Sequence, residues 1–293
     1  MSLRNPLPAL LLVFSAPAWA AEEGVLDPQG PVAAAERTIL VDSLGIMLAI
    51  VLPVIVAILA FAWWFRASNR RAVHLPDWEY SGRIEMVVWS IPAMTIFLLG
   101  GLGWVGAHDL DPPKPLNQDK PLVIEAVSLN WKWLFIYPDQ GVASAGRLVI
   151  PAGKPIEFHV TSSGVMNSFF IPQLGSQIYA MAGMTTRVNL QADTPGSYAG
   201  LSAQFSGDGF SDMRFSADTV PPDQFSQWVD EVHRSAPARL DQAAYAALAK
   251  PGVLVQPVSF GAVEPDLFEH VLRAAVHGQM SHPSHPPLNK ESD

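Results

Sequence analysis

Two segments carry the residues from which a metal site or polar pocket would have to be built. Residues 165–172 read VMNSFFIP and residues 200–213 read GLSAQFSGDGFSDM. The six positions of interest are Asn167, Ser202, Gln204, Ser206, Phe210 and Met213. A serine hydroxyl or an asparagine amide is a hard, weak donor, whereas copper that cycles between Cu(I) and Cu(II) needs thiolate and imidazole. Only Met213 could ligate copper, so the residues predict an empty site.

Composition excludes several other kinds of chemistry. The 293 residues contain no cysteine, which rules out disulfides, zinc-thiolate sites, covalently attached c-type haem and thiolate copper. We find no nucleophile–base pair, phosphate-cradling glycine loop or paired-carboxylate motif, so the chain is not expected to catalyse a reaction by itself. The formal net charge is −9, which excludes nucleic acid as a partner because phosphate binding needs the opposite sign.

Four ordered blocks carry a resemblance that covers nearly the whole mature chain. They are FAWWFRASNR (61–70), SLNWKWLFIYP (128–138), VMNSFFIPQLGSQIYAMAGM (165–184) and the segment 200–213. The chain resembles subunit 2 of bacterial cytochrome bo-type ubiquinol oxidases, which are haem-copper oxidases without the binuclear copper centre of cytochrome c oxidase. In copper-bearing relatives a His, a Cys, a carbonyl-donating Glu, a second Cys, a second His and a Met occupy the six positions above. The resemblance therefore implies that these are vestigial copper positions, which bind nothing.

The resemblance also implies a role within a complex. Such a complex pumps protons and couples quinol oxidation to the reduction of oxygen to water, with haems, copper and the quinol site in subunit 1. This chain is expected to be a non-catalytic assembly subunit without a cofactor, in contact with subunit 1, with subunits 3 and 4 and with membrane lipids. Cytochrome c is not an expected partner. The donor could be ubiquinol or menaquinol, because the quinol pocket lies in another subunit.

Two other functions compete with this expectation. A cytochrome c oxidase subunit with its copper intact is excluded, because no residue present here supplies bridging sulfur. A membrane-tethered exported binding or scaffold protein with a similar domain stays open. Purification would distinguish it, since it would carry no haem.

The elements that must position these segments begin with an export signal. Arg4 provides a positive start, residues 9–14 an apolar run, and Ala18-Trp19-Ala20 a small-x-small cleavage site. A signal peptide over 1–20 is therefore predicted, followed by an exported N-terminal segment over 21–42. Many relatives carry a cysteine here for lipid attachment, and this chain does not.

Two uncharged stretches are each long enough to cross a bilayer, which takes about 20 apolar residues. They predict transmembrane helices over 43–65 and 86–107. The connection over 66–85 holds four arginines, namely Arg66, Arg70, Arg71 and Arg83. Arginine-rich short loops stay in the cytoplasm, so the N-terminus and the C-terminal domain are predicted to lie on the periplasmic side of the bacterial inner membrane.

Beyond a Pro-rich linker over 108–120, residues 121–220 alternate short β-rich runs with turn residues. The runs are LVIEAVSL, WKWLFIYP, RLVIPAG, PIEFHVTSS, NSFFIP, TTRVNLQA, GSYAGLSA and DMRFSADTV. This spacing indicates an antiparallel sandwich or barrel, and the resemblance sharpens it to a cupredoxin-like Greek-key β-barrel. Residues 221–277 change to helical spacing, which resembles the aromatic-bearing C-terminal extension of quinol oxidase subunits. A disordered tail is expected over 278–293.

Several single residues admit more than one role. Trp131 and Trp133 are two apart in an apolar run, which predicts a strand with both rings on one face and a structural role in the core. Glu85 opens the second membrane helix, where a carboxylate can cap the helix dipole. The resemblance implies the alternative, a place at the mouth of a proton channel of the large subunit. His277, His282 and His285 are too irregularly spaced for a fixed metal site, and we expect a disordered tail.

Overall fold

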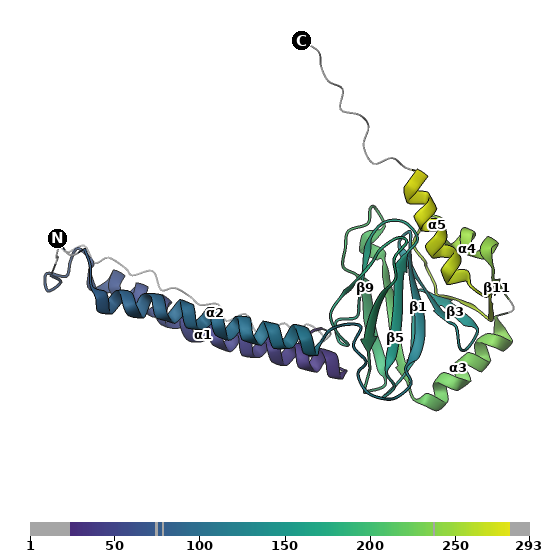
Figure 1. The fold of residues 1–293 in the computed structure, drawn as a ribbon, viewed down its shortest axis with the longest axis horizontal. Coiled ribbons are helices and arrows are strands. Elements are labelled where there is room, and N and C mark those ends of the chain that lie inside the picture. The colour runs from purple at the N-terminus through teal and green to yellow at the C-terminus, as the bar shows by residue number, and fades with distance from the viewer. Residues whose placement is uncertain (1–23, 74–75, 78, 237, 282–293) are drawn as a thin grey trace, which may run out of the picture.

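The computed structural model describes residues 24–73, 76–77, 79–236 and 238–281. Two long helices project from a domain of two β-sheets, and shorter helices cover the side of that domain away from the long pair (Figure 1). The predicted architecture is therefore confirmed: a helix pair, then a cupredoxin-like β-domain, then a helical extension. The predicted signal peptide and the residues from His282 onward lie outside the described residues.

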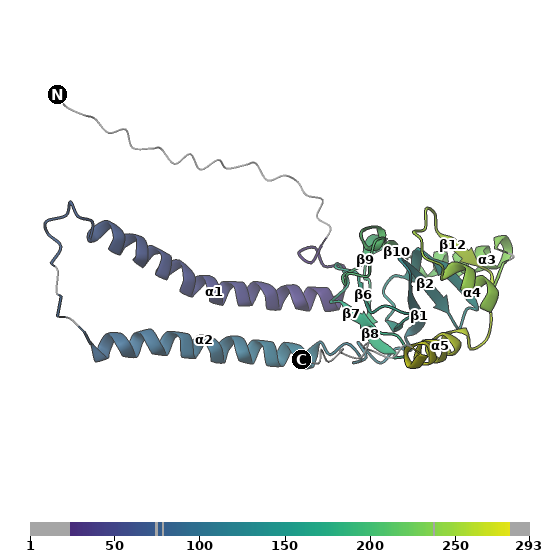
Figure 2. The same ribbon diagram turned by 90° about the horizontal axis from the view of Figure 1, so that it is seen from above.

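The two long helices are α1 (Pro31–Trp64) and α2 (Gly82–Asp109). Both are long and apolar enough to cross a membrane, and the apolar window of each is 0% buried within the chain. Figure 2 shows them running side by side from the same end of the β-domain. Two helices whose apolar spans are this exposed need lipid or another protein around them.

Helix α1 begins twelve residues before the span predicted for it. Pro31 occupies the first turn, where its fixed φ suits a helix start and its missing N–H costs nothing. The first turns dock on the β-domain: the Ala33 amide donates to the Leu174 carbonyl at 3.2 Å, and Ala33 is 1% exposed. Residues 31–42 of the segment predicted as separate over 21–42 therefore belong to α1. The helix extends beyond the apolar span because its first turn is hydrogen-bonded to the β-domain.

The domain contains one six-stranded and one five-stranded sheet. The first has the order β12-β3-β2-β1-β5-β8 and the second β4-β10-β9-β6-β7. The bounds are β1 Leu122–Leu129, β2 Lys132–Tyr137, β3 Val142–Ala145, β4 Arg147–Pro151, β5 Ile156–Ser162, β6 Asn167–Phe170, β7 Ile178–Ala180, β8 Thr186–Leu190, β9 Gly196–Ser202, β10 Arg214–Val220 and β12 Val258–Phe260. The predicted runs do not include β3 and β7, which have four and three residues, since so short a strand shows little periodicity.

The expectation of purely antiparallel pairing is wrong at two places. Strand β1 pairs with β5 in parallel, and so does β10 with β4. The reason is topological: after β1, β2 and β3 the chain crosses to the other sheet as β4, and β5 then returns beside β1 in the same direction. Strands linked by such a crossover become parallel neighbours, which local alternation of residues cannot reveal.

Strand β2 is buried on both faces, so its alternate residues enter two different cores. Trp133, Phe135 and Tyr137 point between the sheets, where Phe169 and Phe215 stack with their ring centroids 5.5 Å apart. Gly200 is required beside this stack, because a Cβ there would lie 2.1 Å from the Phe215 ring. An aromatic pair in such contact adds roughly 0.5–1.5 kcal/mol beyond area burial.

The other face of β2 lies under the C-terminal extension. The extension comprises α3 (Pro222–Ser235), β11 (Arg239–Leu240), α4 (Gln242–Leu248), β13 (Ala262–Val263) and α5 (Leu267–Ser281), together with β12. Leu134 and Ile136 of β2 pack in one cluster with Leu267, Phe268 and Val271 of α5. The continuous apolar run of β2 follows from this second covering layer.

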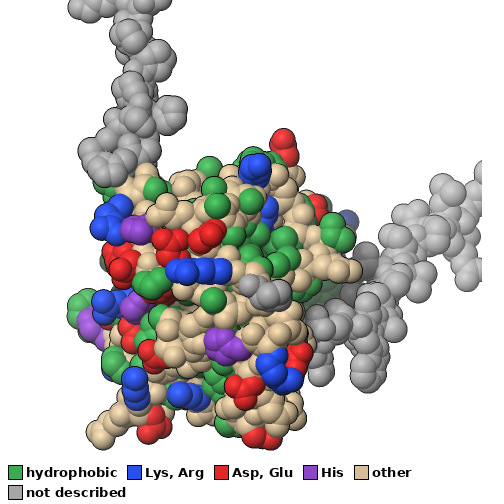
Figure 3. All heavy atoms as spheres, turned by 90° about the vertical axis from the view of Figure 1, so that its right-hand side faces the viewer, with side chains coloured by type: hydrophobic (Ala, Val, Ile, Leu, Met, Phe, Trp, Pro, Cys, Tyr) green, Lys and Arg blue, Asp and Glu red, His purple; other side chains and the backbone are tan. Residues whose placement is uncertain are grey.

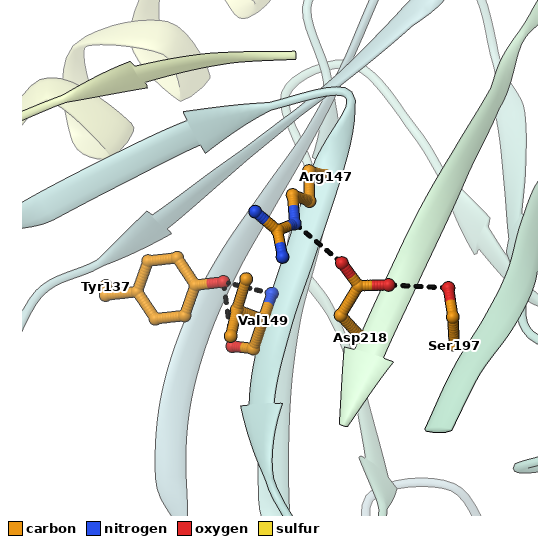
Figure 4. A network of polar contacts seen from close by, with 5 residues as sticks. All are labelled: Tyr137, Arg147, Val149, Ser197 and Asp218. Carbon is orange, nitrogen blue, oxygen red and sulfur yellow. Dashed lines mark hydrogen bonds and ion pairs between the residues drawn. The ribbon is translucent and has the colours of Figure 1, made fainter. Parts of the chain in front are cut away.

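Tyr137 joins the two sheets at the end of β2, next to a group of polar contacts within the five-stranded sheet (Figure 4). The Tyr137 hydroxyl donates to the Val149 carbonyl at 3.0 Å and accepts from the Val149 amide at 2.9 Å. Nearby, Arg147 Nε lies 2.6 Å from Asp218 Oδ2, and Ser197 Oγ donates to Asp218 Oδ1 at 2.6 Å. Tyr137 therefore satisfies both backbone groups of Val149 from the opposite sheet.

Replacing Tyr137 with Phe should destabilise the domain, since two buried backbone groups of Val149 would lose their partner. Leaving buried polar groups unsatisfied costs about 1–3 kcal/mol. Thermal unfolding of the full chain in detergent, followed by circular dichroism, should show a midpoint lowered by several degrees, at roughly 2–4 °C per kcal/mol. Tyr179→Phe is the control, because that side chain is 47% exposed. Equal midpoints for the two variants would contradict this role.

Candidate functional site

The two polar segments meet at one end of the β-domain. Strand β6 begins at Asn167 and pairs with the end of β9, with Phe169 opposite Ser202. Strand β10 pairs with β9 on its other side and begins just after Met213. This register brings Asn167, Ser202 and Met213 close to one another, and they are only 1%, 5% and 1% exposed. Residues 46 apart in the chain are thus neighbours in the fold.

The polar atoms at this end are bonded to one another. Asn167 Nδ2 donates to the Met213 sulfur at 3.1 Å and lies 3.4 Å from Ser206 Oγ. Asn167 Oδ1 accepts from the Ser168 amide at 2.8 Å. The structure therefore joins Asn167, Ser206 and Met213, three of the six predicted positions, in one hydrogen-bonded group.

The remaining predicted positions lie around this group. Ser202 Oγ accepts from the Trp133 indole at 3.1 Å, which fixes the end of β9 against the core. Gln204 is half-buried in the loop that follows. Phe210 begins a short 3-10 helix, Phe210–Asp212, and packs edge-on against Phe205 with ring centroids 5.7 Å apart. Gln204 and Phe210 are outside the bonded group.

Trp131 does not lie on a strand with Trp133, so that prediction is wrong for Trp131. It is in the two-residue turn between β1 and β2, where Leu129 pairs with Lys132, and its φ is +66°. Tight hairpin turns need a left-handed backbone, which an apolar sequence pattern does not reveal. Trp133 is 0% exposed, so its predicted place in the core is confirmed.

The Trp131 side chain covers the loop that contains Ser206. Its indole N–H donates to the Ser206 carbonyl at 3.0 Å. A Cβ on Gly209 would approach the Trp131 ring to 2.4 Å, so only glycine fits beneath it. The rings of Trp131 and Trp133 thus donate hydrogen bonds to Ser206 and Ser202, respectively.

Residues at the same turn also bind the C-terminal extension, and the sequence did not predict this contact. Lys132 Nζ donates to the carbonyls of Leu248 at 3.0 Å and Lys250 at 2.8 Å. Asn130 Nδ2 donates to the Ala249 carbonyl at 3.0 Å. These carbonyls lie at the C-terminal end of α4, where a cation is favourable. The available signal was an Asn and a Lys that interrupt an otherwise apolar run.

The donor set does not fit a binuclear copper centre. Within the described ranges no group of three His, Cys, Asp or Glu side chains could hold a metal ion. The one soft donor, Met213, already accepts from Asn167. The cavity between Trp131, Asn167 and Ser206 measures about 10 Å³, which is room for about one water molecule. The arrangement is a packed polar cluster, and its chemistry is structural.

Glu85 is far from this end of the domain, in the first turn of α2. Its carboxylate accepts from the Trp89 indole at 3.0 Å, one helical turn further on. Its backbone amide donates to the Ser81 carbonyl at 2.9 Å, and the side chain is exposed. The carboxylate is thus held in place with one side open to its surroundings.

Comparison with known proteins places the chain in a family. Residues 122–220 match the family described as Cytochrome C oxidase subunit II, periplasmic domain, and residues 234–279 match the COX Aromatic Rich Motif. The cytochrome bo(3) ubiquinol oxidase subunit 2 of Pseudomonas aeruginosa is 45% identical over 298 residues, covering 97% of this chain and 90% of that protein. The ubiquinol oxidase subunit 2 of Acetobacter aceti is 46% identical over 263 residues, covering 88% and 85%.

Among solved structures, the periplasmic domain of subunit II of cytochrome oxidase from Bradyrhizobium japonicum is 25% identical, covering 40% of this chain and 94% of that one, with a TM-score of 0.37. The family assignment rests on the full-length relatives and on the two matched families. With a helix pair, a cupredoxin-like domain and an aromatic-rich extension in the same order, the chain belongs to the ubiquinol oxidase subunit 2 family of the haem-copper oxidases.

Proposed function

We propose that this chain is the non-catalytic subunit 2 of a proton-pumping ubiquinol oxidase that couples quinol oxidation to the reduction of oxygen to water. The observation that carries the proposal is 45% identity along 97% of the chain to a protein named ubiquinol oxidase subunit 2. The absence of cysteine supports it, because electrons then have no copper acceptor on the outer domain. The quinol site, haems and copper are assigned to subunit 1, and the relatives' names favour ubiquinol over menaquinol as the donor.

The proposed topology puts both ends of the mature protein outside the cytoplasm. In support, the connection between α1 and α2 carries the arginines expected of a cytoplasmic loop. Arg66 donates to the Trp63 carbonyl at 2.7 Å and lies over the Trp63 ring, 4.8 Å from its centroid. Such an aromatic and basic pair is typical of a membrane interface.

The partners proposed are subunit 1, with subunits 3 and 4, and membrane lipids. The exposed apolar side chains of α1 and α2 supply a surface for them, since a helix pair this apolar is stable only in lipid or protein. A cytochrome c is not among the proposed partners. On the face formed by the extension, acidic and basic side chains are interspersed, which does not favour docking of a strongly basic protein (Figure 3).

The six loop positions are proposed to be vestigial copper positions. The support is their chemistry and contacts: amide, hydroxyl, ring and one thioether, with Asn167, Ser206 and Met213 bonded together. In this proposal hydrogen bonds and the two indoles do the structural work that a metal would do. Glu85 is proposed to lie at the mouth of a proton channel of subunit 1, supported by its open carboxylate at the cytoplasmic end of α2.

A tagged chain extracted in mild detergent should bring haem absorption and quinol-driven oxygen uptake with it. The physical reason is that its apolar helix faces remain packed on the haem-bearing subunit during gentle extraction. Absorption spectra and an oxygen electrode make the measurement. A monodisperse but colourless preparation would favour a free-standing exported binding protein instead.

The chain purified without the other subunits should contain far less than one copper per molecule after exposure to copper and dialysis against a chelator. Hydroxyl and amide donors cannot compete with the chelator, and the thioether is weak alone. Elemental analysis measures the metal, and Met213→Leu should leave the result unchanged. Stoichiometric copper that Met213→Leu removes would refute the vestigial assignment.

Glu85→Ala should slow turnover of the assembled oxidase by about tenfold. This loss is smaller than the loss from removing a general acid at a reacting bond, because water can still deliver protons by other routes. Oxygen uptake per haem is the measurement, so that any loss of assembly is corrected. Glu79→Ala in the preceding loop is the control and should turn over normally. If Glu85→Ala assembles and turns over like the parent, Glu85 is only a helix cap.

A further inference from the structure

Helix α5 covers a part of the six-stranded sheet that contains an acidic residue. Glu125 lies on β1, on the same face as Val127, which belongs to the cluster under α5. Its partner on the neighbouring strand β2 is Ile136, a member of the same cluster. A carboxyl group here must share space with the apolar contacts of Phe268 and Leu267.

A cavity of about 330 Å³ separates Glu125 from the start of α5. Its wall includes three further acids, Glu264, Asp266 and Glu269, and no Lys or Arg. Glu264 is engaged, because Oε2 accepts from the Gln242 amide at 3.0 Å. Glu269, in the first turn of α5, is the acid whose charge acts on Glu125. The acids are thus gathered where α5 meets the sheet.

The elements around Glu125 carry basic side chains on β5, β8 and α5. On α5, Arg273 Nε donates to the Glu269 carbonyl at 3.3 Å. On β5, the residue opposite Glu125 is His159, whose Nε2 lies 2.9 Å from Glu157 Oε1. Beyond it, on β8, Arg187 pairs with His159 in the sheet register. Among the described residues, no ion pair joins Glu125 to a cation. When ionised, Glu125 therefore faces Glu269 without a direct counter-charge.

Burial and then the Glu269 carboxylate raise the pKa of Glu125 from its ordinary value of 4.5 to about 7. With α5 docked, the proton is held more tightly than with α5 undocked, where water reaches the carboxyl. Docking is therefore strongest below about pH 4.5, weakens as pH rises through the window up to about 7, and is weakest above it.

We propose that Glu125 and Glu269 form a pH-sensitive latch that seats α5 on the sheet when Glu125 is protonated and loosens it when Glu125 is ionised. Loosening α5 would uncover the cluster of Leu134, Ile136 and Val271. It would also release the turn at Gly183, where a Cβ would lie 2.7 Å from Val276. Because the domain is proposed to project outside the cytoplasm, the latch would respond to external pH.

Hydrogen exchange of the full chain in detergent tests the latch. Exchange of the α5 backbone amides is followed from pH 5 to pH 9 and divided by the intrinsic rate at each pH. We expect opening of α5 to become at least about tenfold more frequent between pH 5 and pH 8, while amides of β1 stay protected. A change in the pKa of Glu125 from 4.5 to about 7 would by itself change the opening equilibrium of α5 by more than tenfold. The partial exposure of Glu125 to water reduces this effect.

Variants separate the latch from general effects of pH. Glu125→Gln mimics the protonated form and should abolish the change, whereas Glu269→Gln should move it to lower pH by removing the facing charge. Glu231→Gln, on the exposed surface of α3, is the matched control and should behave like the parent. Equal α5 protection at pH 5 and pH 8 in the parent would overturn the proposal, as would a transition that persists in Glu125→Gln. Should Glu125→Gln not fold, an unshifted transition in Glu269→Gln would overturn it equally.

Discussion

Burial of β2 on both faces is the constraint on which the rest of the structure depends. Its odd-numbered residues, Trp133, Phe135 and Tyr137, fill the space between the sheets, and its even-numbered residues, Leu134 and Ile136, fill the space under the extension. A strand that is apolar on both sides is stable in water only if both sides are covered. The C-terminal extension is therefore part of the core of this domain, and a domain without it would expose the second cluster to solvent.

The loop end of the domain follows from the same strand. The turn before β2 and the first residue of β2 reach two places. Asn130 and Lys132 donate to backbone carbonyls at the end of α4, and Trp131 donates to the loop after β9. One turn thus holds both the extension and the loop. A typical hydrogen bond contributes about 1 kcal/mol net, so several together are needed to hold a loop without a metal. The two indoles, the Asn167 amide and the close packing over Gly209 provide this here.

The membrane helices and the domain are joined at more than the linker. The Gln29 amide donates to the Gln173 carbonyl at 2.8 Å, and the Asp193 amide donates to the Gln29 carbonyl at 2.8 Å. Gly30 lies so close to Gln191 that a side chain would meet its carbonyl. The start of α1 therefore adds backbone hydrogen bonds to the domain, while the linker after α2 contacts β8 through Asn189 and Pro112. Both helices therefore meet the domain on the same side (Figure 2).

The sequence by itself determined the composition of the loop, the two apolar helices and most strands. These properties are local: a missing thiolate, an uncharged run of about 20 residues and a period of two are visible without any partner. Only the tertiary structure decided the parallel pairing of β1 with β5, the left-handed turn at Trp131, and the contact of Asn167 with Met213. It also decided that Glu125, polar in an alternating strand, lies under α5 beside Glu269. Such features depend on which strands become neighbours after the chain crosses between sheets, and a residue's local pattern is the same whichever neighbour it receives.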